Sequence, residues 1–319
     1  MGYNYDPELE VLLEFLPDAA LTISDPVKAR ASFLELTAQF NAELDKSGVE
    51  IENRSIPGPG GAPDIAIRIY TPAGPSGVVP AILHIHGGGF VIGSLDSELG
   101  SCLALCRNLG VVVVSVDYRL APETPYPGPL EDCFATLCWM HDNSTDLSID
   151  PARLAVYGQS AGGGLSAATS LLARDRGGPP ICFQYLGIPE VDDRLQTPSM
   201  QRFIDTPMWN RPNAELSWDF YLGDQFQRGA DDVPYHAAPA RADDLCDLPP
   251  AYISTMEFDP LRDEGVEYAL KLMRAGVPTE LHSFPGTFHG SSIFAASQIS
   301  QRESTEMFAV LRRALKIDA

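Results

Sequence analysis

The stretch that most constrains this chain is residues 158–164, Gly-Gln-Ser-Ala-Gly-Gly-Gly, which contains the pattern G-x-S-x-G. Residues 153–157 before it read as a short apolar strand, and residues 165–174 after it are rich in Ala and Leu at helical spacing. A strand, tight turn and helix in this order lift the Ser160 hydroxyl above the edge of a sheet. The first free N–H groups of the helix and the positive end of its dipole then face any negative charge that develops there, which suits acyl transfer.

This pattern is weak when it stands alone. The chain has 27 glycines in 319 residues, so a short glycine-flanked serine also arises by chance. Its weight therefore depends on the predicted strand and helix beside it and on what the rest of the chain supplies.

Composition indicates a globular protein. A chain of 319 residues, 45% hydrophobic and 20% charged, is long enough for one large core with a smaller subdomain. The formal net charge of -21 argues against nucleic acid and anionic membrane as partners. No stretch reaches membrane-spanning length without charges or breakers, and the first residues show no basic region followed by an apolar run. We expect a cytoplasmic protein, and the sequence leaves a homodimer open. The charge does not identify a substrate.

The cysteines do not indicate a metal or disulfide framework. There are six, with no C-x-x-C pair and no histidine at a spacing suited to zinc. We predict that all six are reduced and that the protein requires no metal and no cofactor. Cys102 and Cys106 are four residues apart on a predicted helix, where small buried side chains explain them best.

The order of elements predicts an α/β fold. Residues 1–46 read as helical, with helix starts at Asp6-Pro7 and Asp25-Pro26, and residues 49–56 and 64–70 alternate like an antiparallel edge pair. Uniformly apolar strands then alternate with helices, as in a mostly parallel sheet covered on both faces. The predicted strands are 81–85, 111–116, 154–157, 181–188, 251–255 and 279–284, and the predicted helices are 7–15, 26–44, 95–109, 129–141, 160–174, 260–275 and 291–315.

One interval, residues 191–248, is too long for a connection between strands and holds several Trp, Tyr and Phe residues, so we predict a folded insertion. In an open parallel sheet the active crevice lies outside the carboxyl ends of the strands, where such an insertion would lie over it. The predicted organisation is a core of residues 47–190 and 249–319, with a cap formed by residues 1–46 and 191–248.

A second motif complements the serine turn. His84-Ile-His-Gly-Gly-Gly-Phe90 overlaps the end of a buried strand, and its glycines allow backbone N–H groups to approach a ligand. A serine nucleophile needs such a loop to act together with the N–H of the residue that follows it, here Ala161.

The serine also needs a base, which in this fold follows it in the chain. The downstream histidines are His236, His282 and His289. His236 lies late in the insertion and His282 lies inside a predicted strand. His289 lies on a loop just beyond a strand end, where catalytic groups of this architecture belong, so it is the predicted base.

The base needs a carboxylate to orient it. Glu257, Asp259, Asp263 and Glu264 all follow the strand 251–255. Asp259 precedes Pro260 and falls on the loop between strand and helix, which makes it the predicted acid. Asp263 and Glu264 fall in the helix, where interaction with its dipole explains them.

Together these stretches resemble the hormone-sensitive lipase family of α/β-hydrolases, which are mostly bacterial carboxylesterases of family IV. The matching residues are His86-Gly-Gly-Gly89, Asp117-Tyr-Arg-Leu-Ala-Pro-Glu123, Gly158-Gln-Ser-Ala-Gly-Gly163, Asp259-Pro-Leu-Arg-Asp-Glu-Gly265 and His289-Gly290.

The resemblance implies an α/β-hydrolase fold with a helical cap and the catalytic residues Ser160, Asp259 and His289. It also implies an oxyanion hole formed by the N–H groups of Gly88, Gly89 and Ala161. Two positions depart from the family pattern: Gln159 stands where Asp or Thr is usual, and Ser291 follows His289-Gly290 in place of Phe. Neither supplies catalytic atoms, so the departures bear on subfamily and substrate preference.

The predicted activity is hydrolysis of short- to medium-chain acyl esters through an acyl-enzyme. Two alternatives remain at this stage. The same triad can hydrolyse a lactone, an amide or an arylformamide, and nothing in the motifs excludes those bonds. A non-catalytic small-molecule receptor also occurs in this family, in members that have lost the catalytic histidine, whereas His289 is present here.

Overall fold

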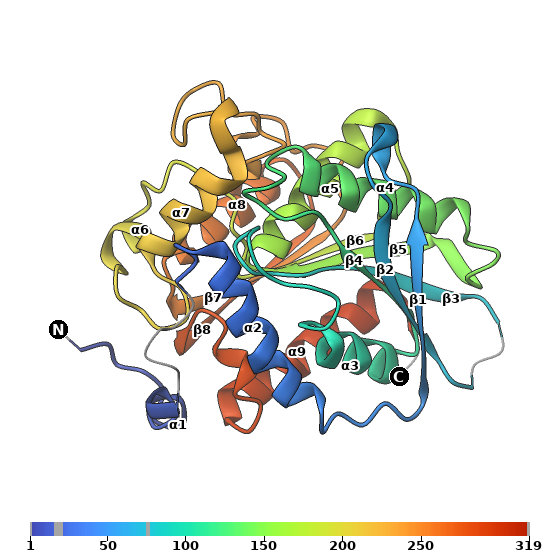
Figure 1. Cartoon of the computed structure of the whole chain (residues 1–319), viewed down its shortest axis with the longest axis horizontal. Helices are drawn as coiled ribbons and strands as arrows, with labels where there is room; N and C mark the ends of the chain where they lie inside the picture. The colour runs from blue at the N-terminus through green and yellow to red at the C-terminus, as the bar shows by residue number, and fades with distance from the viewer. Residues whose placement is uncertain (1, 16–21, 75–76, 318–319) are drawn as a thin grey trace.

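The structure is a computed structural model that describes residues 2–15, 22–74 and 77–317. Its centre is an eight-stranded sheet in the order β1-β2-β4-β3-β5-β6-β7-β8 (Figure 1). β1 and β2 are antiparallel to their neighbours, and the other pairs are parallel. The strands are β1 Val49–Ile56, β2 Ile65–Pro72, β3 Val79–Ile85, β4 Val112–Asp117, β5 Ile149–Gln159, β6 Phe183–Gly187, β7 Ala251–Phe258 and β8 Thr279–Phe288. The predicted α/β architecture and its antiparallel edge are confirmed.

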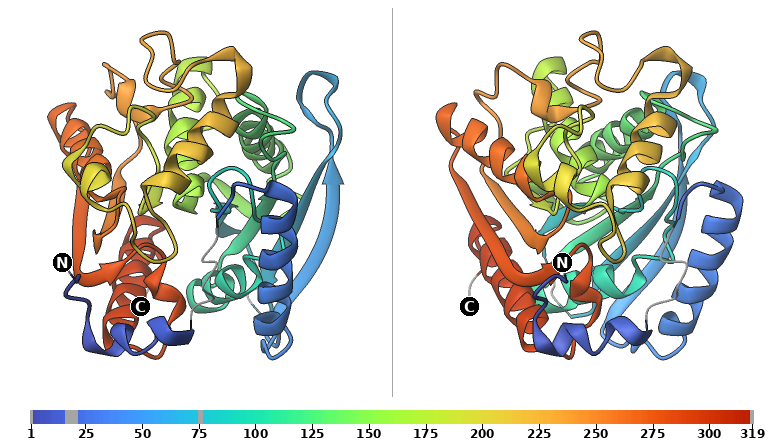
Figure 2. Two further views of the ribbon diagram at one scale, coloured as in Figure 1. Left: turned by 60° about the vertical axis from the view of Figure 1, so that its left-hand side comes forward. Right: turned by 90° about the vertical axis from the view of Figure 1, so that its left-hand side faces the viewer.

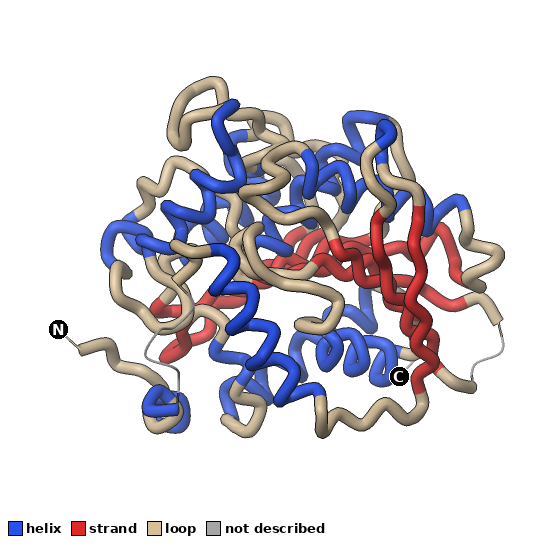
Figure 3. The backbone as a smooth tube through the Cα atoms, viewed as in Figure 1, coloured by secondary structure: helices blue, strands red, loops and turns tan. Residues whose placement is uncertain are grey.

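Helices cover both faces of the sheet, as Figure 3 shows. One face packs on α3 Leu99–Leu109 and α9 Gln298–Ala314, and the other on α4 Gly128–Asp142, α5 Ala161–Arg176 and α8 Arg262–Arg274. The parallel strands are buried on both faces because each face meets a helix layer, which is why they read as continuous apolar runs.

Several predicted boundaries were wrong for local reasons. The predicted helix 291–315 is a 3-10 turn, Ser291–Ile293, followed by α9, because the Ser297 side chain caps a new helix by accepting from the Ser300 N–H. The predicted helix 95–109 begins only at Leu99, since Ser94 and Ser97 hydrogen-bond to each other in a preceding turn. The predicted helix 160–174 excludes Ser160, whose φ of 58° is not helical.

The predicted N-terminal helix 7–15 was also too long. It is α1, Pro7–Glu10, and a 3-10 turn, Leu13–Phe15. The side chains around it, including Leu9, pack into a small cluster with Phe203, Phe258 and Phe288, so docking onto β7 and β8 fixes this segment. α2 spans Pro26–Asn41 rather than 26–44, and residues 16–21 of the predicted helical region 1–46 lie outside the described residues.

The interval 191–248 is folded, as predicted, and contains α6 Pro198–Arg202 and α7 Arg211–Leu222. Both views of Figure 2 show α2 and α7 next to the loop that follows β3. Arg30 of α2 donates to the Val91 carbonyl at 2.8 Å, and Ser217 of α7 donates to the Gly89 carbonyl at 3.0 Å. The two segments therefore meet the core at the carboxyl end of β3.

Candidate active site

Ser160 lies on a sharp turn between β5 and α5. Its φ and ψ are 58° and -126°, outside the regions that residues with a side chain favour. The turn brings α5 very close to the sheet, and only a glycine fits at position 162, because a Cβ there would lie 2.1 Å from the Ile85 carbonyl oxygen. Ser160 donates its N–H to the Gly187 carbonyl at 2.8 Å, and its own carbonyl accepts from the Glu190 N–H at 3.1 Å. The end of β6 and the segment after it thus hold both the N–H and the carbonyl of Ser160.

Three predicted residues are joined by hydrogen bonds. The His289 Nε2 atom lies 2.9 Å from the Ser160 hydroxyl oxygen, and the His289 Nδ1 atom lies 2.7 Å from a carboxylate oxygen of Asp259. The second Asp259 oxygen accepts the Leu261 N–H at 2.8 Å, which fixes the carboxylate. Asp259 is fully buried, and Ser160 and His289 are each 7% exposed. A carboxylate on Nδ1 leaves Nε2 free to accept a proton from the hydroxyl.

The elements of the fold bring these residues together from distant parts of the sequence. Asp259 follows the last residue of β7, and His289 follows the last residue of β8. β8 runs to Phe288, four residues beyond the predicted end, so His289 leaves the strand directly.

The other candidates lie elsewhere. His236 pairs with Asp175 at 2.8 Å, and His282 pairs with Glu306 at 2.6 Å. Each rejected acid accepts a backbone N–H of another segment: Glu257 from Gly286, Asp263 from Ser199 and Glu264 from Val191.

The glycine loop after β3 lies against the serine turn. A Cβ on Gly87 would lie 3.6 Å from the Ser160 Cβ. Gly88 and Gly89 have φ of 110° and 57°, and neither N–H donates to an acceptor within the described residues. Ala161 is the first residue of α5, where N–H groups have no acceptor in the helix. The loop and the helix start thus offer free donors near the Ser160 hydroxyl.

His86 stabilises this loop through its ring. The ring stacks on Tyr118 with centroids 4.0 Å apart, Nδ1 lies 2.8 Å from the Gly87 carbonyl oxygen, and the Tyr118 hydroxyl donates to the His86 carbonyl. Burial lowers the pKa of His86 to about 4, so the imidazole is neutral at neutral pH. It therefore acts as a packed, hydrogen-bonded support for the glycines.

Trp209, from the segment between α6 and α7, completes the wall of the site. Its ring centroid lies 5.8 Å from that of His289, and a Cβ on Gly89 would lie 2.5 Å from the edge of the indole. The sequence indicated only that this segment is aromatic, and no local pattern singles out Trp209. Its position depends on how the interval 191–248 packs on the glycine loop.

Glu190 is a second residue that the sequence analysis did not identify. It is fully buried after β6, and neither carboxyl oxygen has a hydrogen-bond partner among the described residues. Ser217 lies close enough to lower the pKa of Glu190, but the Ser217 hydroxyl donates to the Gly89 carbonyl. Burial and the nearby Asp259 carboxylate raise the pKa of Glu190 to about 8. The group is thus neutral at pH 7 and adds no second charge beside Asp259. A search for polar residues just beyond the carboxyl ends of the predicted strands would have identified Glu190.

Within the described ranges, no three His, Cys, Asp or Glu side chains gather as a metal site requires. No helix among these residues has both the length and the hydropathy that crossing a membrane demands.

Comparison with known proteins agrees with this geometry. The sequence profile of a family described as having the alpha/beta hydrolase fold matches residues 82–293, which include the glycine loop, Ser160, Asp259 and His289. The chain belongs to the α/β-hydrolase family.

Similar members of the α/β-hydrolase family align with nearly the whole chain. Carboxylesterase NlhH of Mycobacterium tuberculosis is 40% identical over 98% of this chain and 97% of its own length. Esterase LipI of the same species is 37% identical over 97% of this chain and 94% of its own. Among solved structures, a bacterial heroin esterase is 52% identical, superimposes with a TM-score of 0.95 and covers 98% of each chain. This α/β-hydrolase therefore shares its complete fold with proteins named as esterases.

Proposed function

We propose that this α/β-hydrolase is a serine carboxylesterase of the hormone-sensitive lipase type, which hydrolyses short- to medium-chain acyl esters through an acyl-enzyme. The observation that carries the proposal is the hydrogen-bonded series Ser160, His289 and Asp259 beside a loop with unused N–H donors. A series of this kind activates a serine hydroxyl, and the donors stabilise the oxyanion that the attack creates.

In the proposed reaction, the Ser160 oxygen attacks the ester carbonyl while His289 Nε2 takes the hydroxyl proton. Asp259 holds Nδ1 and stabilises the imidazolium. The N–H groups of Gly88, Gly89 and Ala161 bind the oxyanion of the tetrahedral intermediate. His289 then gives its proton to the leaving alcohol, and an acyl group remains on Ser160. Water attacks the acyl-enzyme as His289 takes its proton. His289 then returns this proton to the Ser160 oxygen as the bond between that oxygen and the acyl carbon breaks and the acid departs.

Residues 1–46 and 191–248 form the proposed cap, over a core of residues 47–190 and 249–319. The support lies in contacts at the glycine loop, since Arg30 binds the Val91 carbonyl and Ser217 binds the Gly89 carbonyl. Phe90 of the loop stacks on Tyr221 of α7 at 4.0 Å, which adds an apolar contact between core and insertion. A cytoplasmic location and a homodimer stay predictions.

The proposed acyl preference follows from the residues around His289. The Trp209 ring lies beside the imidazole, and α6 and α7 are only 5 and 12 residues long. An aromatic wall next to the base limits the space for an acyl chain, so short chains should fit best.

A series of p-nitrophenyl esters from acetate to palmitate tests the proposal, with Ser160→Ala as the control for background hydrolysis. We expect kcat/KM to be highest for short chains, to fall beyond medium length, and to vanish in Ser160→Ala. Equal or better turnover of palmitate would indicate a lipase instead. No turnover of any ester by the folded protein would favour a receptor.

A further inference from the structure

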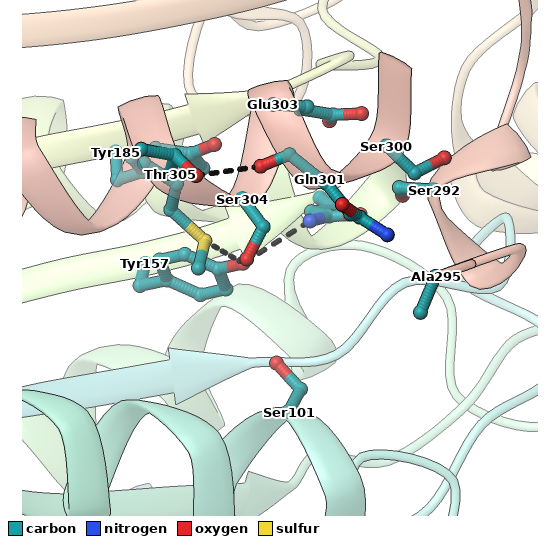
Figure 4. A pocket seen from close by; sticks show the side chains of 12 residues that line it. Ser101, Tyr157, Tyr185, Ser292, Ala295, Ser300, Gln301, Glu303, Ser304 and Thr305 are labelled. Carbon is teal, nitrogen blue, oxygen red and sulfur yellow. Dashed lines mark hydrogen bonds between the residues drawn. The ribbon is translucent and has the colours of Figure 1, made fainter. Parts of the chain in front are cut away.

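A cavity of about 470 Å³ lies between α9 and α3, on the face of the sheet opposite α5 (Figure 4). Ser101 lines it from α3, Tyr157 and Tyr185 line it from the sheet, and Ser300 and Glu303 line it from α9. Its size is within the range of small-molecule sites in proteins. The proposed ester hydrolysis makes no use of this cavity.

The sheet side of the cavity is rigid and polar. Tyr157 and Tyr185 are paired across β5 and β6, and their rings stack with centroids 4.6 Å apart. Gln159 donates its side-chain N–H to the Tyr157 hydroxyl at 3.1 Å. The oxygen of the same side-chain amide has no partner within the described residues. Hydroxyl groups from Ser292 and Ser304 add further acceptors. The lining is thus rich in oxygen atoms that can accept hydrogen bonds.

Glu303 is the one charged residue among the described residues of this lining, and none of them gives it a counterion. The residue is only 6% exposed, yet no hydrogen bond or ion pair joins its carboxyl to another residue of the described ranges. Among the residues that the structure describes, the lining includes no Lys, Arg or His. Buried carboxyl groups are normally paired or hydrogen-bonded because their desolvation is costly. The Glu303 carboxyl is therefore available at the cavity to a partner supplied from solution.

We propose that this cavity binds a small protonated amine, whose ammonium group donates to the Glu303 carboxylate and to neighbouring hydroxyl and carbonyl oxygens. An ammonium ion presents only donors, which matches a lining of acceptors around a single negative charge. A carboxylate ligand would face Glu303 without a cation to offset the repulsion. A neutral ligand would leave the ionised form of the Glu303 carboxyl without a counterion.

The proposal predicts that binding is coupled to proton release. Burial, with a smaller contribution from Glu306, raises the pKa of Glu303 to about 8, so the carboxyl is mostly protonated at pH 7. An ammonium ion requires the carboxylate, so affinity should rise about tenfold from pH 7 to pH 9. The other titratable or charged groups around Glu303 are Glu306 and Arg302 on α9, Glu98 before α3, Tyr157, Tyr185 and Tyr252 on the sheet, and His282 on β8, which pairs with Glu306.

Isothermal titration of the whole protein with n-butylamine tests this. A primary amine remains protonated at pH 9, as a lysine side chain does. We expect saturable binding at pH 9, binding about tenfold weaker at pH 7 with release of close to one proton, and no binding of n-butanol. The proton release is measured from titrations in buffers of different ionisation enthalpy.

Glu303→Gln keeps the shape of the side chain and removes its charge, so it should weaken binding about tenfold or more and abolish the pH dependence. Glu52→Gln is the matched control, since it makes the same charge change on β1, an edge strand separated from β5 by β2, β4 and β3, and should leave binding unchanged. Equal binding by Glu303→Gln, equal binding of n-butanol, or no binding at pH 9 would overturn the proposal.

A second variant does not depend on the buried carboxyl. Ser304 is exposed at the cavity, so Ser304→Leu adds bulk there without burying a new group, and leucine favours the helix. We expect this variant to fold and to bind n-butylamine at least several-fold more weakly. Unchanged binding would show that the amine is held elsewhere on the protein.

Discussion

Asp263 and Ser199 exchange two hydrogen bonds between α8 and α6. The Asp263 carboxylate accepts the Ser199 N–H at 2.7 Å, and the Ser199 hydroxyl accepts the Asp263 N–H at 3.0 Å. Asp259, four residues earlier, instead faces His289. Two aspartates that were close competitors in the sequence thus have separate partners, and this separation can be tested.

We expect Asp259→Asn to nearly abolish turnover and Asp263→Asn to leave most of it. Asparagine at the orienting position favours the wrong imidazole tautomer, and a serine protease with this change loses about ten-thousand-fold in kcat. At Asp263, asparagine still offers an oxygen to Ser199, so we expect only a loss of about 1–2 kcal/mol in the free energy of unfolding. Urea unfolding and ester kinetics on both variants measure the two effects. The reverse ranking would move the catalytic acid to Asp263.

The glycine loop gives a second test. Gly89→Ala should lower kcat about 10²-fold or more, because the new Cβ meets Trp209 at 2.5 Å and displaces the proposed oxyanion donors. Gly110→Ala is the matched control: its φ of 66° imposes similar backbone strain, but among the described residues no atom beyond its chain neighbours lies within 4 Å of the added Cβ.

The double variant Gly89→Ala with Trp209→Ala tests the cause of this loss. Removal of the indole relieves the main clash, so the double variant should recover part of the kcat that Gly89→Ala loses. If Gly89→Ala retained wild-type kcat, the loop would not supply the oxyanion donors.

The sequence predicted the proposed triad because each member is fixed by local structure. Ser160 lies on a turn that its glycines specify, and Asp259 and His289 lie at the ends of recognisable strands. Trp209 and Glu303 were not predicted, because their roles depend on how helices distant in sequence pack together. The break near Ser297 was missed for another reason: helical periodicity continued across it, although a serine cap was present in the sequence.

Glu190 provides a prediction about stability and pH. Its pKa is raised in the folded state from an ordinary value of 4.5 to about 8. The unfolded chain therefore loses this proton first, and the stability that the neutral group contributes is present below pH 4.5 and lost as pH rises towards 8. Glu190→Gln removes this loss. Relative to wild type, its free energy of unfolding should improve between pH 5 and pH 9 by on the order of a few kcal/mol.

Urea unfolding at the two pH values measures the Glu190 effect. Glu267→Gln, at an exposed position on α8, is the control and should follow wild type at both. Parallel pH dependence of Glu190→Gln and wild type would mean that the Glu190 carboxyl is ionised in the folded protein and has a partner there.

Arg30 tests the contribution of α2 to substrate choice. Its guanidinium donates to the carbonyls of Val91 and Ala121, each at 2.8 Å, and to the Glu123 carboxylate, so it ties α2 to the loops beside the proposed oxyanion hole. Arg30→Ala should release this end of α2 and leave Ser160, His289 and Asp259 in place. We therefore expect KM and the ratio of medium- to short-chain kcat/KM to change about threefold or more, with a smaller change in kcat for acetate.

Lys28→Ala, on the same helix with a side chain 84% exposed, should change neither quantity. If Arg30→Ala kept the wild-type chain-length profile while circular dichroism showed an intact fold, α2 would take no part in acyl selection, and the proposed cap would reduce to the insertion.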